Sequence, residues 1–214
     1  TPVPVTSTAA QSQARLRLAL NWSKLGKVQQ ARGRQGSAVE AFERSIEILR
    51  QLRDSKESNV SVAEGELWLS SATSSVELGV SYLSHPESVA DEARGVALLS
   101  DSLELYRQAG SEDYHHGLAA DAQLYLVEHW MRKHRLPESR VLLRDARDAL
   151  LRILKDQPSH MGWRIAWLRS QYLEAQLLAA EGQKQASDAK LAEVGESALI
   201  LLKEQQPGSI RQRG

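Results

Sequence analysis

The sequence contains no cysteine, and its basic and acidic residues, 27 Lys plus Arg and 27 Asp plus Glu, cancel in formal charge. Without cysteine the chain can form no disulfide framework and perform no thiol chemistry, although this absence fixes no compartment. Without a basic excess it lacks the charge imbalance that is usual in nucleic-acid-binding proteins, so we expect no nucleic-acid partner. No apolar run approaches the roughly 20 residues that span a bilayer, and we expect no membrane insertion.

Proline is scarce as well, with 6 residues in a chain of 214. Alanine, leucine, glutamate, glutamine, arginine and serine dominate, and the β-branched residues are not clustered. Such a composition favours helices, and the chain is long enough to bury a sizeable core. We therefore predict an all-α fold.

The two ends differ in composition from the rest of the chain. Residues 1–12 are small and polar with two prolines, which is typical of a linker, and residues 206–214 form a polar tail. We predict a linker at 1–12, a helical domain at 13–205 and a flexible tail at 206–214. Because the sequence lacks a starting Met and a signal pattern, we expect a fragment of a longer protein, with a processed mature N-terminus as the alternative.

The most informative stretch runs from Trp22 to Ser45 and reads as two helices joined by a glycine-rich turn. Gly26 has no side chain, so a second helix can approach closely there, and Phe42 is the only phenylalanine of the chain. Four residues at helical spacing are expected to form the apolar face of the first helix: Leu18, Trp22, Leu25 and Gln29. Ser37 and Glu40 have the spacing of a capping box for the second helix.

A second stretch repeats parts of the first. Leu78-Gly79-x-x-Tyr82 follows the pattern that begins at Leu25-Gly26, and Ser102 to Gln108 is a near copy of Ser45 to Gln51. The order of a Trp, a Leu-Gly pair, and then a small residue four positions before an aromatic is that of the tetratricopeptide repeat. On these residues the chain resembles the tetratricopeptide-repeat family. An ordinary helical hairpin with chance spacing is the alternative.

The resemblance implies an α-solenoid of about four antiparallel helical hairpins. The first is expected at Ala9–Arg34 with Ser37–Arg53, and the second begins near Val62. The third contains Leu118 to Trp130, a turn at Pro137, and a return helix through Leu154, after which Pro158-Ser159 ends the hairpin and can cap the next helix. The fourth runs from about His160, turns at Gly182 and returns through about Lys203. The pattern is weaker in the last two hairpins, for which a plain helical bundle stays open.

For function, the resemblance implies a non-catalytic scaffold that binds a protein or peptide in a concave groove lined by the first helix of each hairpin. Ser23 and Leu83 are among the positions that would flank this groove. The binding residues carried over are Lys27, Gln30, Val80, Glu128, Arg132, Tyr172 and Gln176. Similar arrays occur in bacterial signalling proteins, so we expect the regulatory part of a larger protein, with a homo-oligomer possible and a cytoplasmic location favoured. A small-ligand or peptide sensor is the alternative.

An enzyme is the third function class that we weighed. The best catalytic or metal-binding candidates are His115, His116, His129, His134 and His160. Their spacing is not the two-His, four-apart pattern of a zinc helix, so we predict no catalytic residue, metal or cofactor. We expect His115 and His116 in a loop and the histidines exposed, with His129 partly packed. The five tryptophans fall in predicted first helices and are expected to pack in the core, although Trp163 and Trp167 share a face and could instead form a ligand platform.

Overall fold

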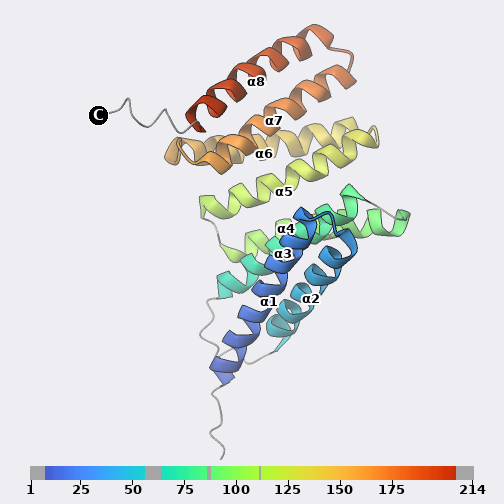
Figure 1. The fold of residues 1–214 in the computed structure, drawn as a ribbon. Coiled ribbons are helices and arrows are strands. Elements are labelled where there is room, and N and C mark those ends of the chain that lie inside the picture. The colour runs from blue at the N-terminus through green and yellow to red at the C-terminus, as the bar shows by residue number, and fades with distance from the viewer. Residues whose placement is uncertain (1–7, 56–63, 86–87, 111, 206–214) are drawn as a thin grey trace, which may run out of the picture. The chain divides into compact units, whose positions relative to one another are not determined.

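The computed structural model describes residues 8–55, 64–85, 88–110 and 112–205. Within these ranges the chain forms eight α-helices and no strand, which confirms the predicted all-α class (Figure 1). The helices are α1 (Thr8–Ala31), α2 (Gln35–Asp54), α3 (Glu64–Ser84), α4 (Val89–Ala109), α5 (Asp113–Arg132), α6 (Leu136–Asp156), α7 (Met161–Ala180) and α8 (Lys184–Gln205). The chain divides into two compact units, residues 1–122 and 123–214, and the boundary falls within α5. Each unit is described by itself.

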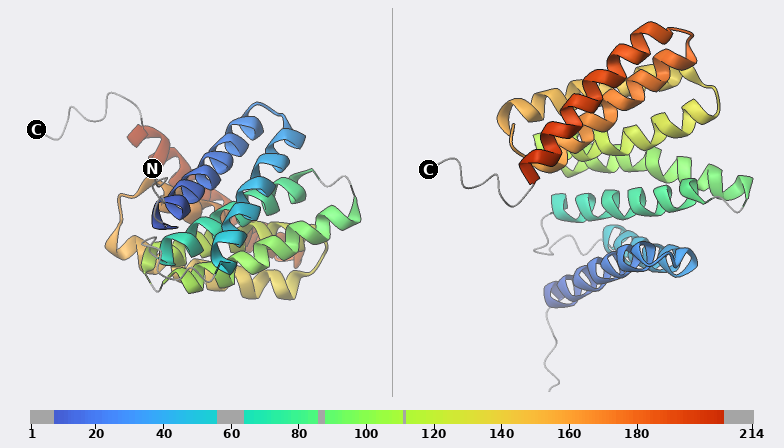
Figure 2. Two further views of the ribbon diagram at one scale, coloured as in Figure 1. Left: turned by 90° about the horizontal axis from the view of Figure 1, so that it is seen from below. Right: turned by 45° about the horizontal axis from the view of Figure 1, so that its top comes forward.

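Unit 1 is built from α1 to α4 and the start of α5. The pairs α1–α2 and α3–α4 pack as hairpins, and α3 also contacts both α1 and α2. In unit 2, α7 packs against α6 on one side and α8 on the other. Figure 2 shows the α1–α2 and α7–α8 pairs from two further directions, with the helices of each pair side by side. Each of these seven helices, α1 to α4 and α6 to α8, therefore packs against a neighbour in the chain.

The face of α1 that is buried differs from the predicted one. Leu18 and Leu25 are 50% and 40% exposed, so the expected stripe faces largely outward. The buried residues are instead mostly small, and they are Ser12, Leu16, Ala19, Ser23 and Gly26. Their four-and-three spacing is as helical as that of the larger residues, but small side chains allow α2 to lie closer.

The first helix begins close to Ala9, where the first hairpin was expected, and overlaps the predicted linker. It begins at Thr8, and Ser12 is buried, so the predicted linker at 1–12 extends too far. Residues 1–7 and the predicted tail at 206–214 lie outside the described residues. The predicted capping box of α2 is also wrong, because the helix begins at Gln35 and its N-cap is Arg34, which makes no side-chain cap. Similarly, His160 rather than Ser159 caps α7, since its side chain accepts a hydrogen bond from Trp163 N at 3.3 Å.

The predicted close approach at Gly26 is confirmed. A Cβ atom at Gly26 would lie 2.5 Å from the Phe42 ring, which is itself fully buried. In the second hairpin, a Cβ at Gly79 would lie 3.0 Å from the carbonyl oxygen of Gly95. The α1–α2 and α3–α4 contacts are therefore both set by glycines that admit a neighbour.

Three of the turns between consecutive helices have the same backbone structure. Gly33, His134 and Gly182 each have a positive φ, of 72°, 57° and 79°. In each turn the next residue's N–H donates 2.9 Å to a carbonyl five positions back, at Gln29, Trp130 and Leu178. This is the Schellman motif, in which a left-handed residue ends one helix. The α1–α2, α5–α6 and α7–α8 connections thus share one turn, although their sequences differ there.

Candidate functional site

In unit 1, two of the predicted binding residues tie α1 to α3. Lys27 Nζ lies 2.7 Å from Glu77 Oε1, and Gln30 Nε2 donates to Ser81 Oγ at 3.4 Å. Lys27 keeps about half of its side chain exposed, and Val80 is half-buried. These side chains therefore hold neighbouring first helices together and leave only part of their surface for a ligand.

Two residues that were predicted to flank the groove are buried instead. Ser23 is buried in the α1–α2 contact, and Leu83 is buried where a Cβ at Gly95 would lie 2.9 Å from its side chain. The sequence pattern could not separate them from their exposed neighbours, because one residue along a helix turns the side chain by about 100°.

In unit 2, Glu128 makes the corresponding bridge from α5 to α7. Arg169 Nε donates to Glu128 Oε1 at 2.8 Å, and the Arg169 guanidinium lies 3.8 Å from the centroid of the Tyr125 ring. Counted from the shared turn, Lys27, Glu128 and Gln176 occupy equivalent positions, six residues before the left-handed residue. The other predicted residues of this unit, Arg132, Tyr172 and Gln176, are exposed.

The histidines and tryptophans differ from expectation in part. His115 and His116 lie in α5 rather than in a loop, and the side chains of His115 and His129 are each buried. All five tryptophans lie in first helices, as predicted. Trp163 is buried and stacks on His160, and Trp167 lies under the Arg147 guanidinium. Trp163 and Trp167 therefore do not form an open platform.

A groove lies between the two second helices of unit 1. Helices α2 and α4 both pack on α3, and a hollow of about 480 Å³ remains between them. Its apolar floor consists of Ile46, Leu78 and Leu98. Its charged rim consists of Glu40, Glu43, Arg44, Glu47, Arg50, Arg94 and Asp101. We call this hollow the α2–α4 groove.

The groove continues along both helices. A second hollow of about 300 Å³ shares Ile46, Arg50, Leu98 and Asp101 with the first. It extends over Leu49 and Leu105. At this end the Arg53 guanidinium lies over the Trp68 ring of α3, 5.2 Å from its centroid. The α2–α4 groove is therefore an elongated surface with apolar residues at its base.

One end of the groove is held by a polar cluster from three helices. Tyr82 Oη of α3 donates to Glu43 Oε1 of α2 at 2.9 Å, and Arg94 Nη2 of α4 donates to the same oxygen at 3.0 Å. The Arg94 guanidinium also lies over the Tyr82 ring. Burial of the phenol, followed by its hydrogen bond to Glu43, raises the pKa of Tyr82 to about 12. Neutral Tyr82 therefore joins α2 to α4 at ordinary pH.

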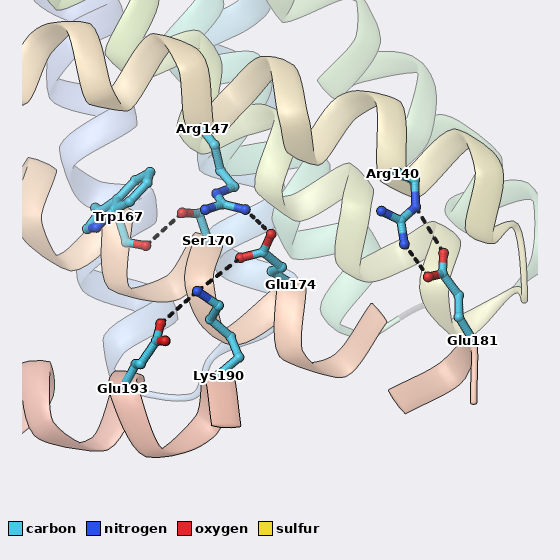
Figure 3. A network of polar contacts seen from close by, with 8 residues as sticks. All are labelled: Arg140, Arg147, Trp167, Ser170, Glu174, Glu181, Lys190 and Glu193. Carbon is cyan, nitrogen blue, oxygen red and sulfur yellow. Dashed lines mark hydrogen bonds and ion pairs between the residues drawn. The ribbon is translucent and has the colours of Figure 1, made fainter. Parts of the chain in front are cut away.

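Unit 2 has a hollow of about 410 Å³ between α6 and α7. Arg140, Arg144 and Arg147 line it from one face of α6, and leucines of both helices lie between them. Figure 3 shows Arg147 paired with Glu174, which also faces Lys190 of α8, and Arg140 paired with Glu181. Arg144 is paired with the neighbouring Asp145, so all three arginines are already paired with carboxylates of the same unit.

Neither a metal centre nor a spanning helix was found in the described part of the chain. The described residues contain no group of three or more His, Asp or Glu side chains placed to hold a metal ion. None of the described helices combines the length and apolar character needed to cross a bilayer. A scan against protein-family models gives no match for this sequence, and a search of curated proteins gives none either.

Proposed function

We propose that this chain is a non-catalytic interaction module built from stacked helical hairpins, and that it binds a segment of a partner protein. The hairpin stack is supported by the shared turn and by α3, which contacts both helices of the preceding hairpin. A hairpin of this kind has an apolar face that only a neighbouring helix can cover. The regulatory role in a larger signalling protein is supported by the family resemblance alone.

The observation that carries the proposal is the α2–α4 groove. It is elongated, its base is apolar at Ile46, Leu78 and Leu98, and its rim carries charges of both signs. An amphipathic helix places an apolar stripe in such a groove and its polar flanks along the rim. The groove lies on second helices, whereas the sequence predicted a surface on first helices. Both surfaces are therefore tested together.

A photo-crosslinking residue would separate these surfaces. It replaces Ala97, which lines the groove, and in a matched control it replaces Ser100, which is also exposed on α4 but does not line it. A third variant carries it in place of Gln176 on the predicted first-helix surface. We expect one partner band to appear with the Ala97 variant and to be absent with the other two. A band with the Gln176 variant alone would support binding at the predicted first-helix surface and contradict binding in the α2–α4 groove.

A sensor of a small ligand is the second candidate, because a hollow of about 480 Å³ has the size of ordinary small-molecule sites. A thermal-shift screen of peptides and metabolites distinguishes the two functions. Stabilisation by a metabolite that Leu98→Glu abolishes would favour the sensor. Stabilisation by a peptide only, lost in the same variant, supports the interaction module.

A further inference from the structure

The last helix exposes an apolar stripe whose first residue has buried counterparts in two other helices. Leu191, Gly195, Leu199 and Leu202 share one face of α8, and we call them the α8 stripe. The three leucines are 40%, 57% and 60% exposed. The stripe is independent of the α2–α4 groove, which lies in the other unit.

Counting from the shared turn identifies the counterparts of Leu191 in other helices. Nine residues after the left-handed residue stand Phe42 in α2, Leu143 in α6 and Leu191 in α8. Phe42 and Leu143 are buried, with 0% and 3% exposure, whereas Leu191 is 40% exposed. Phe42 packs against Leu78 and Tyr82 of the next helix. The start of the α8 stripe, at Leu191, therefore corresponds to the surface on which the following helix packs in the first hairpin. The counterparts of Leu199, which are Arg50 and Leu151, are exposed in the other helices.

The glycine in the stripe also points to a helical occupant. Gly26, Gly79 and Gly95 lie inside helices, and a Cβ at each would come within 3.0 Å of a neighbouring helix. A Cβ at Gly195 would meet nothing within 4 Å. Glycine in the middle of a helix destabilises it relative to alanine. At Gly26, Gly79 and Gly95 the glycine is explained by a close contact with a neighbouring helix. At Gly195 no described residue makes such a contact.

We propose that the occupant is the α8 helix of a second copy of this chain, packed antiparallel about a twofold axis at Gly195. Leu191 and Leu199 lie four residues to either side of Gly195. The axis therefore brings Leu191 of one copy opposite Leu199 of the other. Asp188 and Lys203 lie near the two ends of the stripe, both exposed, and carry opposite charges. In the antiparallel pair each Asp188 lies one residue from direct opposition to the Lys203 of the other copy, and the glycines let the backbones approach.

A single-cysteine experiment tests this geometry, because the 214-residue sequence contains no cysteine. Gly195→Cys places thiols of two copies at the axis, within the range of Cα separations that a disulfide needs. Ala189→Cys is the matched control, since it is also exposed on α8 but lies about 120° round the helix. We expect Gly195→Cys to form a cross-linked dimer at least tenfold faster. Equal rates would overturn the proposal.

Sedimentation of the 214-residue chain over a concentration series tests the association itself. The stripe is smaller than a standard interface, so we expect a dimer that forms only at high concentration. Gly195→Leu should weaken it at least tenfold and leave the diluted monomer folded, because a side chain there meets open space. Asp188→Lys should weaken it about three- to tenfold, as exposed ion pairs do, and adding Lys203→Asp should restore it.

Each of these measurements can refute the proposal. A chain that stays monomeric at the highest concentration would assign the stripe to a helix from another source. A dimer that survives Gly195→Leu would place the interface elsewhere. A charge swap that fails to restore association would exclude the antiparallel register.

Discussion

The two units bring helices together in different ways. Unit 1 places glycines where helices meet, at Gly26 against Phe42 and at Gly79 against Gly95. In unit 2 the described glycines lie at a helix start, in a turn and on the exposed face of α8. The core of unit 2 is filled by large side chains, namely Leu143, Leu150, Ile153, Trp163, Leu173 and Leu177.

This difference predicts opposite weaknesses. A helix contact set by glycine leaves no room, so added volume at that position must push the helices apart. A contact filled by leucines depends on volume that is already there, so truncation leaves a cavity. The contact at Phe42 has both properties, because its large buried ring fills the space left by Gly26.

The largest effect is expected from removing that ring. Phe42→Ala should lower the free energy of unfolding by about 3–5 kcal/mol, as for other buried aromatic truncations. Leu143→Ala, the equivalent position of unit 2, should cost less, at about 2–4 kcal/mol, because a smaller side chain is lost. Urea denaturation measures both changes. If Phe42→Ala unfolds like the parent, the ring does not hold the first hairpin together and the comparison between units fails.

Substitutions that add volume should show a sharper difference between the two units. Gly26→Leu should destabilise by about 1–3 kcal/mol, because its Cβ already meets the Phe42 ring. The matched change Gly195→Leu should stabilise diluted protein by about 0.5–1 kcal/mol through helix propensity. The double variant Gly26→Leu with Phe42→Ala should be more stable than the sum of the single changes predicts, since the leucine occupies part of the cavity. Simple additivity would show that the two residues do not share one space.

The sequence predicted the helices well and their buried faces less well. The Leu-Gly pattern led to the Gly26–Phe42 contact and to Gly79, because a glycine inside a helix has few purposes other than close approach. It led to the wrong face of α1, since a search for apolar spacing selects Leu18 and Leu25. The helix instead buries Ser12, Ala19 and Ser23. Small polar residues give little periodic signal, although their serine hydroxyls can bond to a neighbouring backbone.

The candidate groove could not be predicted for a different reason. Its base takes Ile46 from α2, Leu78 from α3 and Leu98 from α4, so it depends on how three helices pack. The spacing of residues within one helix cannot reveal how three helices pack together. Charges were equally ambiguous, because Lys27 and Glu128 look like ligand-binding side chains in the sequence and form bridges between helices in the structure. Glu43 and Arg94 were not singled out from the sequence, and Tyr82 was noted only as part of the repeat pattern, because the cluster exists only where the three helices meet.

A smaller effect is expected at the shared turn. His134 occupies the left-handed position that glycine fills in the first and fourth hairpins. A non-glycine residue there is strained by about 1–2 kcal/mol. His134→Gly should therefore stabilise the chain by about 1 kcal/mol, and Gly33→Ala should destabilise it by a similar amount. Thermal unfolding of both variants measures the changes. If neither changes stability, the turns do not set the geometry of their hairpins, and the positional equivalence of the units loses its basis.

The last effect is expected from pH, and it concerns unit 1 alone. Folding raises the pKa of Tyr82 from 10 to about 12, since the buried phenol that donates to Glu43 resists ionisation. A group whose pKa is raised by folding contributes stability that is complete below its unfolded pKa and is lost as the pH rises through the folded one. Stability should therefore fall between about pH 10 and 12. Tyr82→Phe should lack this part of the decline while being less stable at neutral pH, where its bond to Glu43 is missing. Urea midpoints taken at about pH 7, 10 and 11.5 give the comparison, with Tyr172→Phe, at an exposed position of unit 2, as the control. A decline that is the same in all three proteins would mean that the bond from Tyr82 to Glu43 does not support the α2–α4 groove.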